Sequence, residues 1–257
     1  MPKAKRPADL ADAAPRRSTR PRRTVAEAKA AEISAVEQPA VKTRPKYNPK
    51  ESKPQTVVES AVRLDAPDKR DSRGRLIFKD HPDFRPTLRP KDVIQAGSFG
   101  GIYFNPRGGR PGIISPKGVD IDHKEFPADW FEGLEPDMYR GRKYRTEVNK
   151  YKVNAGQNQT AWEEKGWIKP ELDPRGWFQW YSRYYMGRRT DDDERQIKRW
   201  KGVAGEKGRW KRALVNRVLA ANKHFNDASV SPVLCQTLLH WAYELTERDF
   251  EEMRKRI

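Results

Sequence analysis

Acidic and histidine side chains gather near the middle of the chain, and their types could support metal chemistry. Asp120, Asp122, His123 and Glu125 lie within the segment DIDHKEF. They offer the oxygen and nitrogen donors that a hydrolytic metal site uses. Alternation along an extended segment would place Asp120 and Asp122 on one face and His123 on the other, and neighbouring lysines can neutralise the acids. A solvated loop is the simpler interpretation, with a metal-dependent nuclease centred on Asp120, Asp122 and Glu125 as an alternative.

A second acidic run, from Asp191 to Glu194, directly follows Thr190. Thr190 and Asp193 resemble a capping box at the start of a helix. Acidic side chains are also favourable at the positive end of a helix dipole. The run is therefore interpreted as a helix start and not as a metal site.

The sequence contains no motif for a bound cofactor or for nucleophilic catalysis. Neither a Gly-x-Ser-x-Gly motif nor a nucleotide-binding glycine loop is present. The single cysteine, Cys235, excludes an intrachain disulfide, and with four scattered histidines it cannot form a thiolate zinc cluster. Cys235 lies among leucines, where a small buried side chain is expected. We therefore expect a protein without a cofactor or metal that is not an enzyme.

Positive charge and aromatic side chains coincide between Asp173 and Arg217. This stretch holds 13 Lys or Arg against six Asp or Glu, a net +7 of the chain's +17, and four of the eight tryptophans. Such a local excess attracts polyanions. The pattern predicts nucleic-acid binding, with DNA favoured over RNA, through phosphate contacts. The candidate residues are Arg188, Arg189, Lys198, Arg199, Lys201, Arg209, Lys211 and Arg212.

The aromatic side chains of this stretch have two interpretations. Tryptophans at helical spacing usually form a core, so all four are assigned first to packing and only second to base stacking: Trp177, Trp180, Trp200 and Trp210. A solvated charged face would also explain the basic residues. A further alternative is a protein-interaction or scaffold module in which exposed Phe178 and Tyr185 serve as hot spots.

Residues 1–75 have the composition of a disordered basic tail. They hold nine of the 20 prolines and one aromatic residue, Tyr47, too little apolar surface to offset the entropy of ordering. An arginine cluster within residues 16–23 resembles a nuclear address, whereas Asp9, Asp12 and Glu27 argue against an organelle transit peptide. No apolar run has the length of a membrane span. We expect a nuclear protein without membrane association.

Residues 76–136 favour short strands or extended segments. β-favouring pieces occur at residues 76–78, 92–95, 101–104 and 112–115, punctuated by Gly and Pro. The glycine-rich residues 96–101 separate two of these pieces. They predict a hairpin loop, with a loop that contacts a ligand through its backbone as the alternative.

Residues 137–257 have a helical pattern. Asp173 as N-cap and Pro174 at the first helical position predict a helix over 174–186, whose apolar face is built from tryptophans and tyrosines. A second helix follows Thr190 and buries Ile197 and Trp200.

A third helix is predicted over 209–224 and a fourth from Ser231-Pro232, again a cap followed by proline. The fold class is therefore α+β. A single domain over 76–257 would combine an extended or hairpin segment (76–136) with a compact bundle of about four helices.

Four long segments resemble an uncharacterised family of basic, tryptophan-rich eukaryotic proteins of fungi and algae, with relatives in large DNA viruses. They are RPGIISPKGVDIDHKEFP (110–127), DPRGWFQWYSRYYMGRRTDDDERQIKRW (173–200), GRWKRALVN (208–216) and LLHWAY (238–243). The resemblance covers about residues 80–243 and supports the domain boundary. It brings no activity or catalytic residues. Relatives are more basic before LLHWAY than SPVLCQT is here, which argues against nucleic-acid contact by the fourth helix.

Overall fold

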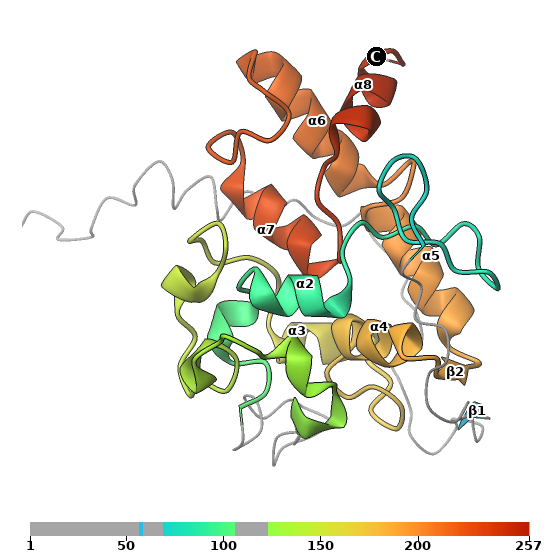
Figure 1. The fold of residues 1–257 in the computed structure, drawn as a ribbon, viewed down its shortest axis with the longest axis vertical. Coiled ribbons are helices and arrows are strands. Elements are labelled where there is room, and N and C mark those ends of the chain that lie inside the picture. The colour runs from blue at the N-terminus through green and yellow to red at the C-terminus, as the bar shows by residue number, and fades with distance from the viewer. Residues whose placement is uncertain (1–56, 59–68, 106–122, 257) are drawn as a thin grey trace, which may run out of the picture.

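The computed structural model describes residues 57–58, 69–105 and 123–256, and this part of the chain is mostly helical (Figure 1). Its α-helices are α2 (Pro90–Gln95), α3 (Gln159–Glu164), α4 (Trp177–Tyr185), α5 (Asp193–Val203), α6 (Arg209–Ala221), α7 (Pro232–His240) and α8 (Glu247–Arg254). Short 3-10 helices are η1 (Phe99–Gly101), η2 (His123–Glu125), η3 (Ala128–Trp130), η4 (Pro136–Met138) and η5 (Thr146–Val148). None of the helices in the described ranges is long and apolar enough to cross a membrane.

Helix α4 forms the centre of the hydrophobic core. Trp177, Trp180, Tyr181 and Tyr184 are all at most 1% exposed, which confirms the apolar face predicted from their spacing. The predicted N-cap is wrong, because Gly176 occupies that position with φ 78° and the helix begins at Trp177. Asp173 instead turns inward and pairs with two arginines, so its carboxylate is not available to cap the helix.

The helices after α4 follow the predicted order. Helix α5 buries Ile197 and Trp200, and α6 ends at Ala221, where Asn222 adopts a left-handed conformation. Ser231 and Pro232 begin α7 as expected. The charged tail forms a separate helix, α8, which packs against α6.

The prediction of strands and a hairpin in 76–136 is wrong for the described residues. Residues 92–95 belong to α2, because Pro90 occupies its first turn and the Asp92 carboxylate accepts hydrogen bonds from the backbone N–H and the guanidinium of Arg89. These end effects outweigh the β-propensity of Val93 and Ile94. Residues 99–101 form η1 in place of a hairpin loop. Residues 112–115 lie outside the described residues.

Within the described ranges, the one sheet has two strands, β1 (Val57–Val58) and β2 (Arg189–Thr190), which pair antiparallel. In addition, Arg70 forms an isolated antiparallel bridge with Leu76. Residues 69–75, which precede the predicted boundary at residue 76, therefore contact the rest of the described chain. Ion pairs hold this segment in place, because Arg73 pairs with Glu206, Asp249 and Glu252. Most of the predicted tail lies outside the described residues.

One hydrophobic cluster runs from Leu76 to Met253 and includes side chains from α2, α4, α5, α6, α7 and α8. Phe84 is fully buried and its ring contacts those of Trp180, Tyr181, Tyr184 and Trp200. The segment before α2 is thus held on α4 and α5 by aromatic packing. Helix α2 packs against α4 and η3.

Candidate nucleic-acid interface and an aromatic cavity

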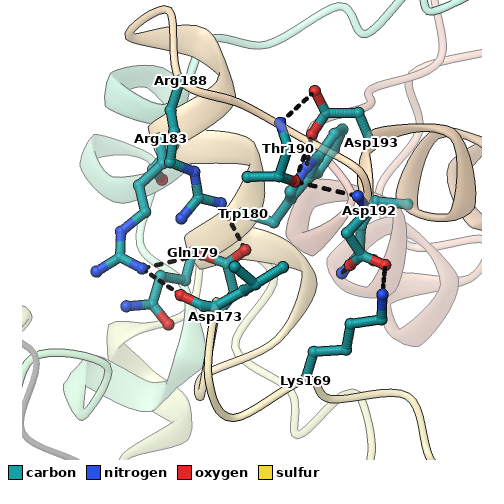
Figure 2. A network of polar contacts seen from close by, with 12 residues as sticks. Lys169, Asp173, Gln179, Trp180, Arg183, Arg188, Thr190, Asp192 and Asp193 are labelled. Atoms are coloured by element: carbon teal, nitrogen blue, oxygen red, sulfur yellow. Dashed lines mark hydrogen bonds and ion pairs between the residues drawn. The ribbon is translucent and has the colours of Figure 1, made fainter. Parts of the chain in front are cut away.

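The conspicuous charges between residues 169 and 196 form a buried network (Figure 2). Asp173 is 1% exposed and accepts hydrogen bonds from Arg183 (3.0 Å) and Arg188 (2.5 Å). Burial raises the pKa of Asp173, although both guanidinium groups act in the opposite direction. The Arg188 guanidinium is therefore paired within the fold, and a phosphate at this residue would have to compete with Asp173.

The acidic run after Thr190 belongs to the same network (Figure 2). Asp193 accepts hydrogen bonds from Trp180 Nε1 (2.8 Å) and from both Thr190 N and Oγ1. The predicted capping box is present only in part, because Asp192 is the N-cap of α5 and the Thr190 hydroxyl accepts the N–H of Asp192. Asp192 accepts hydrogen bonds from Lys169 and Arg195. Burial alone would raise the pKa of Asp192, but these two cations hold it below its ordinary value.

Three more of the predicted phosphate contacts have partners within the protein. Arg189 pairs with Asp80 and lies 3.8 Å from the centre of the Tyr184 ring. Lys201 binds Asp83 at 2.9 Å, although both side chains stay partly exposed. Lys211 is 2% exposed and donates to Asp249 at 2.7 Å, so the prediction is wrong at this residue because its ammonium is enclosed.

Arg199 is held by aromatic rings and a carbonyl oxygen. Its guanidinium carbon lies 5.1 Å from the Trp162 ring centre and 5.5 Å from that of Trp241, and Nη1 donates to the Trp167 carbonyl at 3.0 Å. Cation–π contacts of this kind pin the side chain against α3. Arg199 therefore joins α5 to α3 and the segment after α7.

The remaining predicted cations are accessible. Lys198 and Arg212 are exposed, and no acid among the described residues pairs with them. Arg209 is half-buried over the Trp210 ring at 4.7 Å, and burial lowers its pKa. Lys207, in the loop between α5 and α6, is exposed as well and likewise has no acid partner within the described residues. These four cations, on α5, on α6 and in the loop between them, are called the α5–α6 cationic face.

The residues named for the two alternative functions, a protein-interaction module and a metal-dependent nuclease, are buried, paired or outside the described ranges. Phe178 and Tyr185 are 4% and 5% exposed, so they cannot serve as exposed hot spots. Glu125 forms an ion pair with Arg183, which removes it from a metal site, while Asp120 and Asp122 lie outside the described residues. The described ranges contain no group of three or more His, Cys, Asp or Glu side chains that could hold a metal ion.

A cavity of about 660 Å³ opens on a different part of the molecule. Its walls are aromatic and come from separate elements, with Phe99 from η1, Trp162 from α3, Trp177 and Phe178 from α4, and Trp241 from the end of α7. The volume is in the range of small-molecule sites, which are mostly apolar with a few placed polar groups.

His240 is a polar group in the wall of this cavity. Its Nε2 accepts the backbone N–H of Phe99 at 3.2 Å and lies 3.0 Å from the amide nitrogen of Gln236. Burial lowers the pKa of His240 to about 3, so the ring is neutral. Because Nε2 faces two N–H donors, the ring proton resides on Nδ1.

The loop that carries Phe99 is held in an unusual conformation. Phe99 itself has φ 53°, a left-handed conformation that is uncommon outside glycine. Asn149 accepts the N–H of Gly100 at 2.8 Å, and a Cβ at Gly97 would lie 2.1 Å from the Val148 carbonyl oxygen. The glycines of residues 96–101 thus permit close backbone approach, and the Phe99 ring stacks on His240 at 4.3 Å.

The cavity cannot be predicted from local sequence patterns, because its lining is spread over residues 99–241. A histidine inside the apolar run LLHWAY is a signal that points to it. Comparisons with known protein families, with curated proteins and with solved structures find no match to this chain.

Proposed function

We propose that this protein binds nucleic acid through the α5–α6 cationic face and does not catalyse a reaction. The observation that carries the proposal is the exposure of Lys198, Lys207 and Arg212, none of which has an acid partner within the described ranges. Unpaired exposed cations can exchange their counterions for phosphates at little structural cost. The chain's net charge of +17 acts in the same direction.

Duplex DNA is the proposed ligand, in preference to RNA. Arg209 and Arg212 lie in the first turn of α6, which is 13 residues long. The first turn of an exposed helix is the part that recognition helices present to the major groove of DNA, and the deep major groove of RNA is too narrow to admit one. A nuclear location, proposed from the arginine cluster in residues 16–23, would place the protein with this ligand.

The test is binding of the full-length chain to labelled duplex DNA, single-stranded DNA and duplex RNA by fluorescence anisotropy at several salt concentrations. The informative variant combines Lys198→Gln, Lys207→Gln and Arg212→Gln. We expect duplex DNA to bind most tightly, and the variant to lose affinity for every sequence tested, because phosphate contacts carry no sequence information.

The matched control removes three other exposed cations, Lys223, Lys255 and Arg256, which lie beyond the C-terminal ends of α6 and α8. Both triple variants lower the net charge equally. Loss of affinity in the first variant alone supports the proposal. Equal loss of affinity in both variants would mean that net charge alone determines DNA binding, which contradicts a specific role of this face. Absence of DNA binding by the wild-type chain would refute the proposal.

A further inference from the structure

We infer that the aromatic cavity binds a single nucleobase, stacked on its aromatic walls and hydrogen-bonded to Nδ1 of His240. The inference deepens the proposed function and rests on it in one respect, because nucleic acid is then a source of the base. The same base chemistry is available from a free nucleotide. The observations that carry it are the cavity's shape, its donor and its charge.

The walls select a flat ligand. Trp162 is half-buried and its ring stacks on that of Trp241 at 6.0 Å, so Trp162 supplies the more accessible ring of the wall. Trp241, Trp177 and Phe178 complete the aromatic lining, but they are only 9%, 1% and 4% exposed. Aromatic surfaces of this kind accept planar rings by stacking, and every nucleobase has such a face. A cavity of about 660 Å³ is large enough for one base with its sugar.

Aromatic walls can bind a cation as well as a neutral planar ring. The polar and charged groups of the lining distinguish these two kinds of ligand. The described residues that line the cavity include Arg175 but no Asp or Glu, so the wall offers no carboxylate to hold a quaternary ammonium or other cationic ligand. The ligand is therefore neutral or anionic. A nucleotide combines a neutral planar base with an anionic phosphate.

His240 supplies a hydrogen-bond donor with a fixed direction. Both N–H groups that face Nε2 hold the imidazole in the tautomer with its proton on Nδ1. No described residue accepts a hydrogen bond from Nδ1, and a Cβ at Gly156, another lining residue, would lie 3.9 Å away from it. A ring nitrogen or carbonyl oxygen of a base can accept this proton.

The surrounding structure fixes the donor before a ligand arrives. Phe99 stacks on the imidazole with an interplanar angle of 14°, and Gln236 is 0% exposed. Gln236 also accepts the N–H of Tyr151 at 3.0 Å, so its amide cannot rotate without breaking this bond. Such preorganisation is characteristic of binding sites.

The experiment monitors quenching of tryptophan fluorescence in the full-length chain by AMP, GMP, CMP and TMP, and by a short single-stranded oligonucleotide. Ribose 5-phosphate serves as the ligand without a base. We expect saturable quenching by at least one nucleotide and none by ribose 5-phosphate. The relative affinities of the nucleotides and the oligonucleotide then identify the source of the base.

Two variants test the cavity directly. Ala161→Phe places a ring at a lining position of α3 and should abolish quenching, whereas Thr160→Phe adds the same ring at a neighbour that does not line the cavity. His240→Gln keeps an acceptor for the Phe99 N–H but removes the donor at Nδ1. It should weaken binding about tenfold, the effect of one hydrogen bond. Thermal unfolding verifies that each variant is folded.

The outcomes separate this inference from the proposed function. Salt-dependent DNA binding without saturable quenching would overturn the cavity inference and leave the proposed function intact. Nucleotide quenching that Ala161→Phe abolishes, in a chain that binds no DNA, would support the cavity and refute the proposed function. Equal quenching by ribose 5-phosphate, or unchanged quenching in Ala161→Phe, would also overturn the inference.

Discussion

Asp173 lies between two guanidinium groups in the interior of the protein, with Arg183 on one oxygen and Arg188 on the other. An isolated charge in such a place would be costly, and pairing with hydrogen bonds is what makes it tolerable. The same holds for Lys211, whose side chain is 3% exposed against Asp249 at 0%. At the scale of single residues, a basic side chain can therefore pair with a buried acid in the core instead of binding a ligand.

Replacing Asp173 by Asn should destabilise the protein strongly. The substitution leaves Arg183 and Arg188 without their shared buried carboxylate, a loss that typically costs about 3–5 kcal/mol. The free energy of unfolding in urea measures it. Asp80→Asn is the control, since the Asp80 side chain is 44% exposed against Arg189 and its loss should cost at most about 1 kcal/mol. Similar values for both variants would contradict the account of Asp173.

The buried acids also predict how stability depends on pH. Burial alone would raise the pKa values of Asp192 and Asp249, but hydrogen bonds and nearby cations hold both below the ordinary value of 3.8. The stability they contribute is present above the unfolded pKa and is lost as pH falls through the folded values. Urea unfolding from neutral to acid pH should show this loss. Asp192→Asn should flatten the acid limb, and an unchanged limb would contradict the assignment.

At the scale of elements, local signals predict the helices that carry their own ends. Pro232 starts α7 through its fixed φ, and hydrogen bonds between Thr190 and Asp193 hold the start of α5. Both signals act between neighbours in sequence. The predictions are wrong where contacts with residues distant in sequence determine the local structure. Asp173 leaves its N-cap position for arginines at 183 and 188, and residues 99–101 are shaped by contact with Val148 and Tyr144. Neither partner can be inferred from local spacing.

The close packing of the Phe99 loop makes Gly97 a sensitive position. Gly97→Ala would place a Cβ 2.1 Å from the Val148 carbonyl oxygen at φ +85°, so strain and overpacking should together cost about 2–4 kcal/mol. Gly74 has a similar φ of +75° with open space around it, and Gly74→Ala should cost only the backbone strain, about 1–2 kcal/mol. Thermal or urea unfolding compares them, and equal losses would refute the close approach.

At the scale of the whole molecule, the two candidate sites occupy different elements. The cationic face belongs to α5, α6 and their connecting loop, whereas the cavity is walled by η1, α3, α4 and the end of α7. In Figure 1, α6 lies at the top and α5 at the right, and α3 and α4 lie near the lower middle. The positive charge of the first site is visible in the sequence, but the enclosure of single cations depends on partners that are distant in sequence, such as Asp249 for Lys211. The second site has no local sequence pattern, because its lining comes from residues 99–241.

This separation predicts that the two binding properties can be lost independently. The Lys198, Lys207 and Arg212 triple variant should bind DNA more weakly and still bind nucleotides, because no residue of the cationic face lines the cavity. Ala161→Phe should lose nucleotide binding but keep the salt-dependent part of DNA binding. Parallel anisotropy and fluorescence titrations measure both. A joint loss in either folded variant would contradict the assignment of two separate sites.

The most direct test of the central claim is the slope of log affinity for duplex DNA against log salt concentration. Each phosphate contact contributes about 0.9 to that slope, so removing Lys198, Lys207 and Arg212 should reduce it by about 2–3. The Lys223, Lys255 and Arg256 control should keep the wild-type slope. A slope that is the same in the wild type and in the first variant would contradict the claim that this face binds nucleic acid.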